Sequence, residues 1–293
     1  MTLNKWLEKN TVSLKGKIVA ITGSTGGLGR ELCFYLAMLG ADLVLVDRNF
    51  KKSNSLKEEI INAFPKSKVM LITADMEDFS SVKAATIKLI SLNIYALILN
   101  AGAYSIPRKT TDLGFDNLFQ INFISPYYMA KKLMPHLETN GGRVVAVGSI
   151  AHNYSKAKNE DIDFSKVKAN SKAYGNAKRF LMFSLWELFK DKASPILAIT
   201  HPGITFTGIT NHYPKVIFAL IKHPMKVVFM KPKKAALSVL NGLFEATPHN
   251  NWIGPRFFGI WGLPKRTLLK TCTPEEQQFI LSTAEEIFKS LEK

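Results

Sequence analysis

Tyr174 and Lys178 are the two side chains in this sequence best suited to moving a proton near neutral pH. They are four residues apart, and the apolar residues that follow recur at the spacing of a helix, so both side chains should lie on one helical face. Ser171 occupies the position of a helix N-cap. An ammonium beside a phenol favours the phenolate and should lower the tyrosine pKa from its usual value of about 10. The pair could therefore act as a proton donor and acceptor, although so short a motif also fits a half-buried tyrosine with a solvated lysine.

A glycine-rich turn near the N-terminus is typical of dinucleotide binding. The apolar run at 17–22 predicts a strand buried in a parallel sheet, and a leucine-patterned helix that ends at Gly40 follows the turn. Glycines let the backbone approach a pyrophosphate, and the first turn of the helix offers amide donors. The residues predicted to bind the cofactor here are Gly23, Ser24, Thr25, Gly26, Gly27, Leu28 and Gly29.

Two charged residues stand at the end of the next predicted strand, 42–47: Asp47 is its last residue and Arg48 follows it. Asp47 lies about 20 residues beyond the glycine turn and could bind the adenosine ribose hydroxyls, which favours NAD because a 2′-phosphate would be repelled. Arg48 could instead hold that phosphate and favour NADP. The sequence leaves the choice between NAD and NADP open, with a slight preference for NAD.

Strands and helices alternate six times along the chain. This pattern predicts one α/β domain over 1–293, a Rossmann-type doubly wound parallel sheet with helices on both faces. About seven strands in the order 3-2-1-4-5-6-7 are expected, with the seventh near 256–260 and a final helix over 273–293. The other predicted strands are 17–22, 42–47, 68–73, 95–99, 142–148 and 195–200.

Polar residues and tight turns follow several of these strands, at the edge where open parallel sheets bind ligands. Asn122 stands in an otherwise apolar helix predicted over 115–137, where a buried amide needs partners. Asp75, past the third strand, could cap a helix or bind the adenine. The candidates at this edge are Asp75 and Met76, the turn Asn100, Ala101 and Gly102, Ser149 after the fifth strand, and Pro202 with Gly203 after the sixth.

Together these motifs resemble the short-chain dehydrogenase/reductase family, in the family's order and over about residues 16–260. The matching segments are 22–29, 100–102, Asn122, Ser149, Tyr174 with Lys178, and 202–203. The glycine turn fits both the shorter and the extended, epimerase-type branch, and Leu99 replaces the usual first Asn of the turn before Asn100. The Asn-Ala-Gly turn and the short C-terminal region favour the shorter branch. The segment 149–152 further resembles the retinol-dehydrogenase-like subgroup.

The resemblance implies a role for each of the four polar residues. Tyr174 would exchange a proton with the carbonyl or alcohol oxygen, and Ser149 would hydrogen-bond that oxygen. Lys178 would lower the Tyr174 pKa and bind the nicotinamide ribose, and Asn122 would hold a water in a proton relay. The catalytic set is thus Asn122, Ser149, Tyr174 and Lys178, with Tyr174 and Lys178 also contacting NAD or NADP.

The segment 204–230 departs from the regular alternation and mixes apolar residues with lysines. It is expected to be an apolar substrate lid; an ordinary core helix pair and a membrane-surface segment are the alternatives, the latter giving peripheral membrane contact through 206–230. No run of residues is long and apolar enough to span a membrane.

Composition narrows the function classes further. The net charge of +16 is spread over helix surfaces, so a nucleic-acid partner is not expected. Two distant cysteines match no metal spacing, and with no apolar signal-peptide core they indicate a reducing, cytoplasmic location. Family resemblance implies a homodimer or homotetramer.

The expected function is therefore NAD(P)-dependent interconversion of an alcohol and a carbonyl on an apolar small molecule. The alternatives are a cofactor-sensing regulatory or binding protein on the same fold, and a sugar-nucleotide epimerase.

Overall fold

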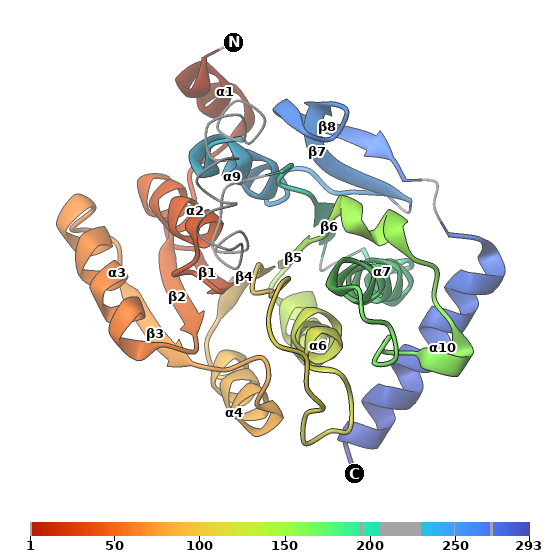
Figure 1. The fold of residues 1–293 in the computed structure, drawn as a ribbon. Helices are drawn as coiled ribbons and strands as arrows, with labels where there is room; N and C mark the ends of the chain where they lie inside the picture. Colours follow the sequence, from red (N-terminus) through yellow and green to blue (C-terminus); the bar gives the residue numbers. More distant parts are fainter. Residues whose placement is uncertain (1, 194–195, 205–229, 249, 270–271) are drawn as a thin grey trace, which may run out of the picture.

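The computed structural model describes residues 2–193, 196–204, 230–248, 250–269 and 272–293. Its centre is one eight-stranded sheet with the strand order β3-β2-β1-β4-β5-β6-β7-β8 (Figure 1). The first seven strands are parallel, and β8 pairs with β7 in the antiparallel sense. The strands are β1 Ile18–Thr22, β2 Asp42–Asp47, β3 Val69–Thr73, β4 Ile94–Leu99, β5 Arg143–Val147, β6 Ile196–Thr200, β7 Asn251–Phe257 and β8 Trp261–Leu268.

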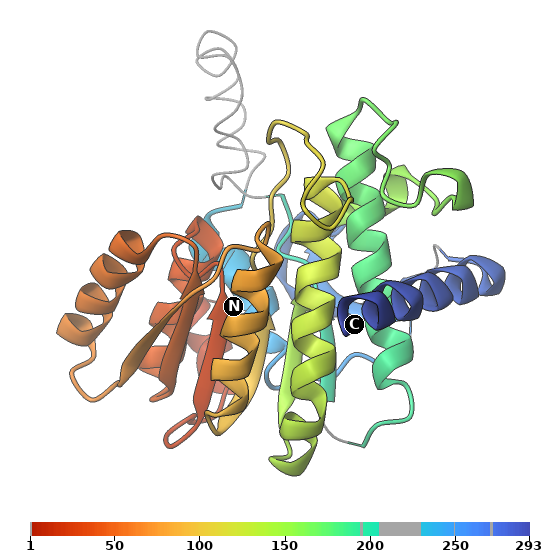
Figure 2. The same ribbon diagram turned by 90° about the horizontal axis from the view of Figure 1, so that it is seen from below.

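Helices cover both faces of the sheet, as the alternation predicts (Figures 1 and 2). One core cluster joins the sheet to α1 Leu3–Asn10, α2 Gly27–Met38, α3 Phe50–Ala63 and α9 Pro232–Asn241. The other joins it to α4 Phe79–Ile90, α6 Ser125–Thr139, α7 Asn170–Phe189 and α10 Pro274–Leu291. None of the described helices is both long enough and apolar enough to cross a membrane.

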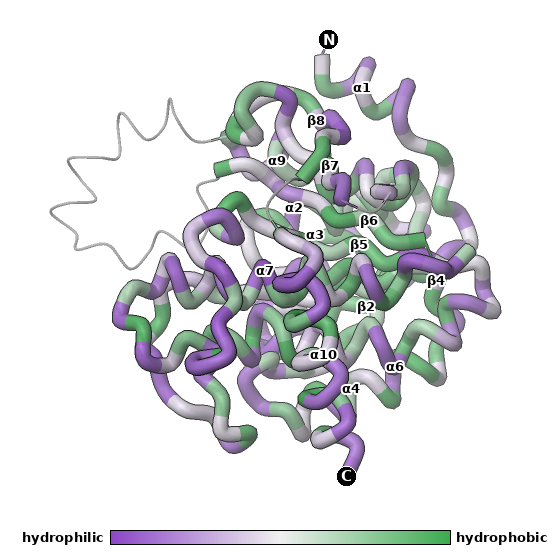
Figure 3. The backbone as a smooth tube through the Cα atoms, turned by 90° about the vertical axis from the view of Figure 1, so that its right-hand side faces the viewer, coloured by the Kyte–Doolittle hydropathy of each residue, from purple (hydrophilic) through white to green (hydrophobic). Residues whose placement is uncertain are grey.

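The central strands are apolar on both faces because each face carries a helical layer. In β1, Val19, Ala20 and Ile21 are fully buried, and the strand pairs with both β2 and β4. In Figure 3, which colours the backbone by hydropathy, the strands in the middle of the sheet are mostly in the hydrophobic green. Burial on two sides explains why these strands appear in the sequence as continuous apolar runs rather than alternating ones.

Four details differ from the sequence-based expectations. The sheet has an eighth strand, and the seventh lies at Asn251–Phe257 rather than near 256–260. The helix expected over 115–137 is divided into α5 Asn117–Phe119, a π-helical segment Gln120–Ile124 and α6. Helix α7 begins at Asn170 behind Ala169, so Ser171 is inside the helix and is not its N-cap. The proposed lid falls almost entirely outside the described residues.

The parallel arrangement determines where a site can form. All seven parallel strands point the same way, so the turns that follow β1, β2, β4, β5 and β6 meet at one edge of the sheet. In open sheets of this kind ligands bind at the carboxyl edge, beside the point where the strand order reverses. Here the strand order reverses between β1 and β4, and the glycine turn follows β1 at this point.

Candidate active site

The glycine turn is packed so tightly that only glycine fits at two of its positions. Gly23 has φ +67°, and a Cβ there would lie 2.8 Å from the Ala101 Cα. A Cβ on Gly29 would lie 2.3 Å from the Gly23 carbonyl oxygen. Helix α2 starts behind Gly26, whose lack of a side chain leaves no side-chain cap hydrogen bond on the first turn. A backbone surface with amide donors at a helix N-terminus fits a dinucleotide pyrophosphate.

Thr22 and Asn100 fasten this turn to the end of β4. The Thr22 hydroxyl accepts hydrogen bonds from the backbone amides of Asn100 and Ala101, each at 3.0 Å. The Asn100 side-chain amide in turn donates to the Thr22 and Gly23 carbonyl oxygens at 3.0 and 2.9 Å. The turn 100–102 is thus joined to the glycine turn, and contact of both with one cofactor stays a prediction. The sequence analysis did not predict that the Thr22 hydroxyl joins the two turns. Its position at the end of a strand, directly before the glycine turn, is the only feature of the sequence that could have indicated this role.

Asp47 lies at the tip of β2 and is bound by the glycine turn. Its carboxylate accepts from the Ser24 hydroxyl, and from the Thr25 amide and hydroxyl at 3.1 and 2.9 Å. Arg48 follows it and is exposed. Asp47 and Arg48, the two residues expected to decide between NAD and NADP, therefore have different surroundings. Asp47 is held by hydrogen bonds, and Arg48 is in solvent.

Asp75 and Met76 lie beside the end of β3. Asp75 does not cap the following helix, since Asp78 accepts from the Ser81 amide at the start of α4 and is the N-cap. The Asp75 carboxylate instead accepts from the Glu77 amide at 3.1 Å. Met76 is buried, and its carbonyl oxygen accepts from the Ser125 hydroxyl at 2.6 Å. The expectation that Asp75 caps the helix is therefore wrong, and its contact with adenine stays a prediction.

Tyr174 and Lys178 share one face of α7, as their spacing predicts. The Lys178 ammonium lies 5.8 Å from the centre of the Tyr174 ring and donates to the Val147 carbonyl oxygen at 2.8 Å. The Tyr104 ring, in the loop after β4, meets the Tyr174 ring edge to face with centres 5.1 Å apart. Sequence reasoning did not identify Tyr104, because nothing in the sequence indicates which side chain of a long loop reaches the tyrosine.

The pKa values of this pair differ from the sequence-based expectation. Burial raises the pKa of Tyr174 to about 12, although the hydrogen bond with Ser149 acts to lower it. Burial also lowers the pKa of Lys178 to about 8. Desolvation disfavours the charged form of each group, and for the tyrosine it outweighs any effect of the neighbouring cation. Tyr174 is consequently a neutral phenol near pH 7, in the state that donates a proton.

Ser149 lies between the end of β5 and a short 3₁₀ segment, Ile150–Tyr154. Its hydroxyl accepts from the Ala151 amide at 3.2 Å and forms the side-chain hydrogen bond with Tyr174. Its carbonyl oxygen lies 2.5 Å from the His152 Nδ1 atom, and this contact fixes the turn. Ser149 and Tyr174 are therefore brought together although 25 positions separate them in the chain.

Asn122 lies in the π-helical segment and is fully buried. Its side-chain amide donates to the Ala103 and Leu118 carbonyl oxygens, each at 2.8 Å, and its Oδ1 atom accepts from the Ala103 amide at 3.2 Å. A Cβ on Gly102 would lie 2.8 Å from Asn122 Oδ1 and 3.6 Å from Lys178 Nζ. The four predicted catalytic residues and Gly102 thus converge, and π-helical segments are frequent at functional sites.

Pro202 and Gly203 follow β6 and meet the β7–β8 hairpin. Gly203 has φ +81°, and a Cβ there would lie 2.7 Å from the Ile260 carbonyl oxygen. Beside them a pocket of about 300 Å³ opens between the turn after Ser149 and the hairpin. Its lining includes Ile150, Asn153, Trp252, Gly254, Pro255, Arg256, Phe258, Gly259 and Thr267. The hairpin therefore contributes to the surroundings of the site, which the sequence did not predict.

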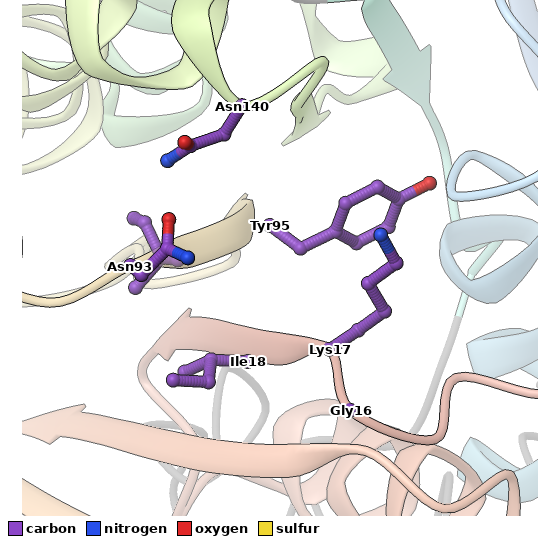
Figure 4. A pocket seen from close by; sticks show the side chains of 7 residues that line it. Gly16, Lys17, Ile18, Asn93, Tyr95 and Asn140 are labelled. Carbon is purple, nitrogen blue, oxygen red and sulfur yellow. The ribbon is translucent and has the colours of Figure 1, made fainter.

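A second pocket lies at the opposite edge of the sheet, at the starts of β1 and β4. Its lining includes Asn93 and Asn140, and the Lys17 ammonium lies 4.6 Å from the centre of the Tyr95 ring (Figure 4). It measures about 110 Å³ and contains none of the predicted site residues. This pocket is separate from the candidate active site.

Comparison with known proteins indicates the family to which the chain is related. The family model described as short chain dehydrogenase matches residues 17–162. Mouse retinol dehydrogenase 12 is 30% identical over 206 residues, which cover 69% of this chain and 65% of that protein. Mouse polyprenol dehydrogenase is 24% identical over 253 residues, 83% of this chain and 75% of that protein.

Solved structures share the fold over almost the whole chain. A protein from Mycobacterium paratuberculosis superposes with a TM-score of 0.77 at 23% identity, covering 96% of each chain. A short-chain dehydrogenase from Sphingobium yanoikuyae in complex with NADPH superposes with a TM-score of 0.60 at 20% identity, covering 94% of this chain and 95% of that one. The motifs and the matches lead to one conclusion: the chain belongs to the short-chain dehydrogenase/reductase family of NAD(P)-dependent oxidoreductases.

Proposed function

We propose that this protein interconverts an alcohol and a carbonyl compound with a nicotinamide cofactor, using Tyr174 as the acid and base. The observation that carries the proposal is the convergence of Tyr174, Ser149, Lys178 and Asn122 at the carboxyl edge of the sheet, next to the glycine turn. A regulatory protein that only senses the cofactor has no need of all four groups.

The residues present account for the proton in the reaction. In reduction, Tyr174 donates its proton to the carbonyl oxygen, and Ser149 donates a hydrogen bond that stabilises the charge developing there. The Lys178 ammonium, held by the Val147 carbonyl, stabilises the phenolate that remains. A nicotinamide cofactor bound at this edge would supply or accept the hydride. In oxidation the phenolate removes the proton from the alcohol.

The substrate we propose is a long apolar alcohol or its carbonyl form. Two relatives carry names for such compounds, retinol and polyprenol. The pocket beside Ser149 is lined in part by Ile150, Trp252 and Phe258, which suit an apolar chain better than a sugar nucleotide. This apolar lining weakens the epimerase alternative.

For the cofactor we propose a preference for NAD over NADP. Asp47 is held at the β2 tip by Ser24 and Thr25, yet a carboxylate has about four acceptor positions and retains capacity for a ribose hydroxyl. A 2′-phosphate at this place would meet a nearly buried carboxylate, and the repulsion between them is poorly screened there. Arg48 is exposed and attracts a phosphate more weakly.

Replacing Tyr174 by Phe tests the reaction. Turnover of a panel of apolar alcohols and aldehydes should fall by at least about a thousandfold, because the proton donor is lost. The dissociation constant for the cofactor, measured by calorimetry, should stay within about threefold of wild type. Tyr104→Phe is the matched control, since it removes the phenol hydroxyl of the ring that packs against Tyr174. Equal turnover in Tyr174→Phe and the wild type would contradict the assignment.

Asp47→Asn tests the cofactor preference. Calorimetry of the wild type should give tighter binding of NADH than of NADPH, and the variant should reduce that ratio by about tenfold because the repelling charge is removed. Arg48→Gln should leave the NADH affinity unchanged. Tighter NADPH binding by the wild type, lost in Arg48→Gln, would instead assign the selectivity to Arg48.

A further inference from the structure

The tip of the β7–β8 hairpin exposes large apolar side chains at the edge of the sheet. Phe258 is 87% exposed and Phe257 56%, and Trp261, which pairs with Phe257 at the start of β8, is also exposed. Single exposed apolar residues are ordinary, but several on one hairpin indicate a surface that meets something apolar. We call this surface, formed by Phe257, Phe258 and Trp261, the hairpin patch.

The backbone at Phe258 is strained as well as exposed. Its φ is +52°, in the left-handed region that a bulky L-residue rarely adopts. The adjacent Gly259 also has a positive φ, +67°, but glycine adopts it without cost. Neither folding nor solubility benefits from a phenyl ring in this conformation and in solvent, so the ring requires another explanation.

The charge around the patch identifies what would cover it. Residues 251–268 contain Arg256, Lys265 and Arg266 and no acidic residue, and the whole chain carries +16. Arg266 lies 3.5 Å from Glu245 in an exposed ion pair, whereas Arg256 and Lys265 have no acidic partner among the described residues. Aromatic rings beside basic side chains match the headgroup region of an anionic bilayer, which takes up the rings and attracts the charges.

A second copy of the chain fits the patch less well. A two-fold contact would bring the basic residues of both hairpins into one interface, and residues 251–268 offer no acidic residue to pair with them. Strand β8 also carries Pro264, which has no amide hydrogen to donate, beside Lys265. Proline and lysine on an edge strand are the features that prevent pairing with another strand.

The patch lies close to the candidate active site. The Gly259 carbonyl oxygen lies 2.8 Å from the His201 Nε2 atom at the end of β6, and the Ile260 carbonyl is packed against Gly203. Phe258 lines the same pocket as Ile150, the residue after Ser149. A surface bound to the patch would therefore meet the mouth of that pocket.

We propose that the hairpin patch docks the protein on an anionic phospholipid bilayer and turns the pocket beside Ser149 towards it. The use of the membrane as the source of an apolar substrate rests on the proposed function. Membrane binding itself does not, and it can be tested separately.

The test is cosedimentation of the full chain with phosphatidylcholine vesicles, with and without phosphatidylglycerol. Wild type should bind the anionic vesicles, and added salt should weaken the binding. The double variant Phe257→Ser with Phe258→Ser should bind about tenfold or more weakly, because each ring loses its apolar burial. The variant Arg256→Gln with Lys265→Gln should bind more weakly and depend less on salt. Ile87→Ser, which removes a separate exposed apolar side chain on α4, should bind as the wild type does.

Phe258→Gly separates docking from folding. Glycine relieves the positive φ, so the melting temperature should stay the same or rise while vesicle binding falls. The cofactor affinity should be unchanged in every hairpin variant, so failure of the membrane proposal would be distinct from failure of the proposed chemistry.

Three outcomes would overturn the proposal. The wild type could fail to bind anionic vesicles, or the double variant could bind them as tightly as the wild type does. Light scattering could also show a lipid-free dimer that the double variant dissociates, which would make a second copy the partner.

Discussion

At the residue scale, the surroundings of Tyr174 and Lys178 matter as much as their spacing. Lys178 is buried and Tyr174 half-buried where α7 meets the end of β5 and the loop after β4, and burial moves their pKa values towards the neutral forms, to about 12 for Tyr174 and about 8 for Lys178. At pH 7 the phenol is therefore protonated and the amine is still mostly charged. That combination prepares the site for donating a proton to a carbonyl.

A pH profile of carbonyl reduction tests this description. The value of kcat/KM should be level near neutral pH and fall above about pH 8, because Lys178 then loses the charge that stabilises the phenolate. Alcohol oxidation requires the phenolate and should rise with pH over the same range.

Lys178→Arg provides the matched control for the profile. Arginine keeps its charge over the whole range, so the fall in reduction above pH 8 should disappear even if the rate itself is lower. An unchanged inflection in Lys178→Arg would assign the titration to another group.

At the scale of elements, the catalytic helix α7 is joined to the C-terminal helix α10 by a buried ion pair. The Arg179 guanidinium, next to Lys178, donates to both Glu276 carboxylate oxygens, at 2.6 and 2.5 Å. The same carboxylate accepts from the Ala157 amide at 2.7 Å, in the loop that precedes α7. The final helix thus holds both α7 and its preceding loop, and the expectation of a structural helix over 273–293 agrees with this contact.

Glu276→Gln should destabilise the protein by about 3 kcal/mol, because it removes the carboxylate charge that faces the buried Arg179 guanidinium. Chemical unfolding measures the change directly. Glu275→Gln, one residue away and fully exposed, should change the stability much less. If the two substitutions changed the free energy of unfolding equally, the Arg179–Glu276 ion pair would not contribute to stability as proposed.

At the scale of the whole molecule, two buried histidines, His152 after β5 and His201 after β6, meet at Trp252 near the start of β7. His201 stacks on Trp252 with ring centres 4.8 Å apart, and His152 meets the same indole edge to face at 5.4 Å. His152 Nε2 and His201 Nδ1 are buried with no hydrogen-bond partner in the described structure. Burial lowers the pKa of each imidazole to about 4.

This burial makes the fold sensitive to acid. Because each folded-state pKa lies below the usual 6.5, the unfolded chain binds more protons between pH 4 and 6.5, and stability falls as the pH drops through that range. The loss approaches about 3 kcal/mol for each histidine at pH 4. Urea unfolding at several pH values measures it.

His201→Phe keeps a ring against Trp252 and should make that pH dependence shallower by about one proton. A dependence as steep in His201→Phe as in the wild type would contradict the assignment.

Local signals in the sequence were sufficient for the fold class and for the candidate residues. Apolar runs that end in glycines, polar residues or tight turns identified six parallel strands, because each run must be buried on both faces and each turn must satisfy its own backbone. The four-residue spacing of Tyr174 and Lys178 placed them on one helical face, because the helix repeat is a local property. The glycine turn was recognisable because close packing permits no side chain at Gly23 or Gly29.

Tertiary structure alone decided which distant segments meet, and with what effect. It placed Tyr104 against Tyr174, turned the Asp47 carboxylate towards Ser24 and Thr25, and added β8 as an edge strand. It also reversed the expected direction of the Tyr174 pKa shift, because desolvation depends on everything packed around a group and not on its neighbour one turn away. Spacing along the chain determined which groups could act, and burial in the folded chain determined their charge states.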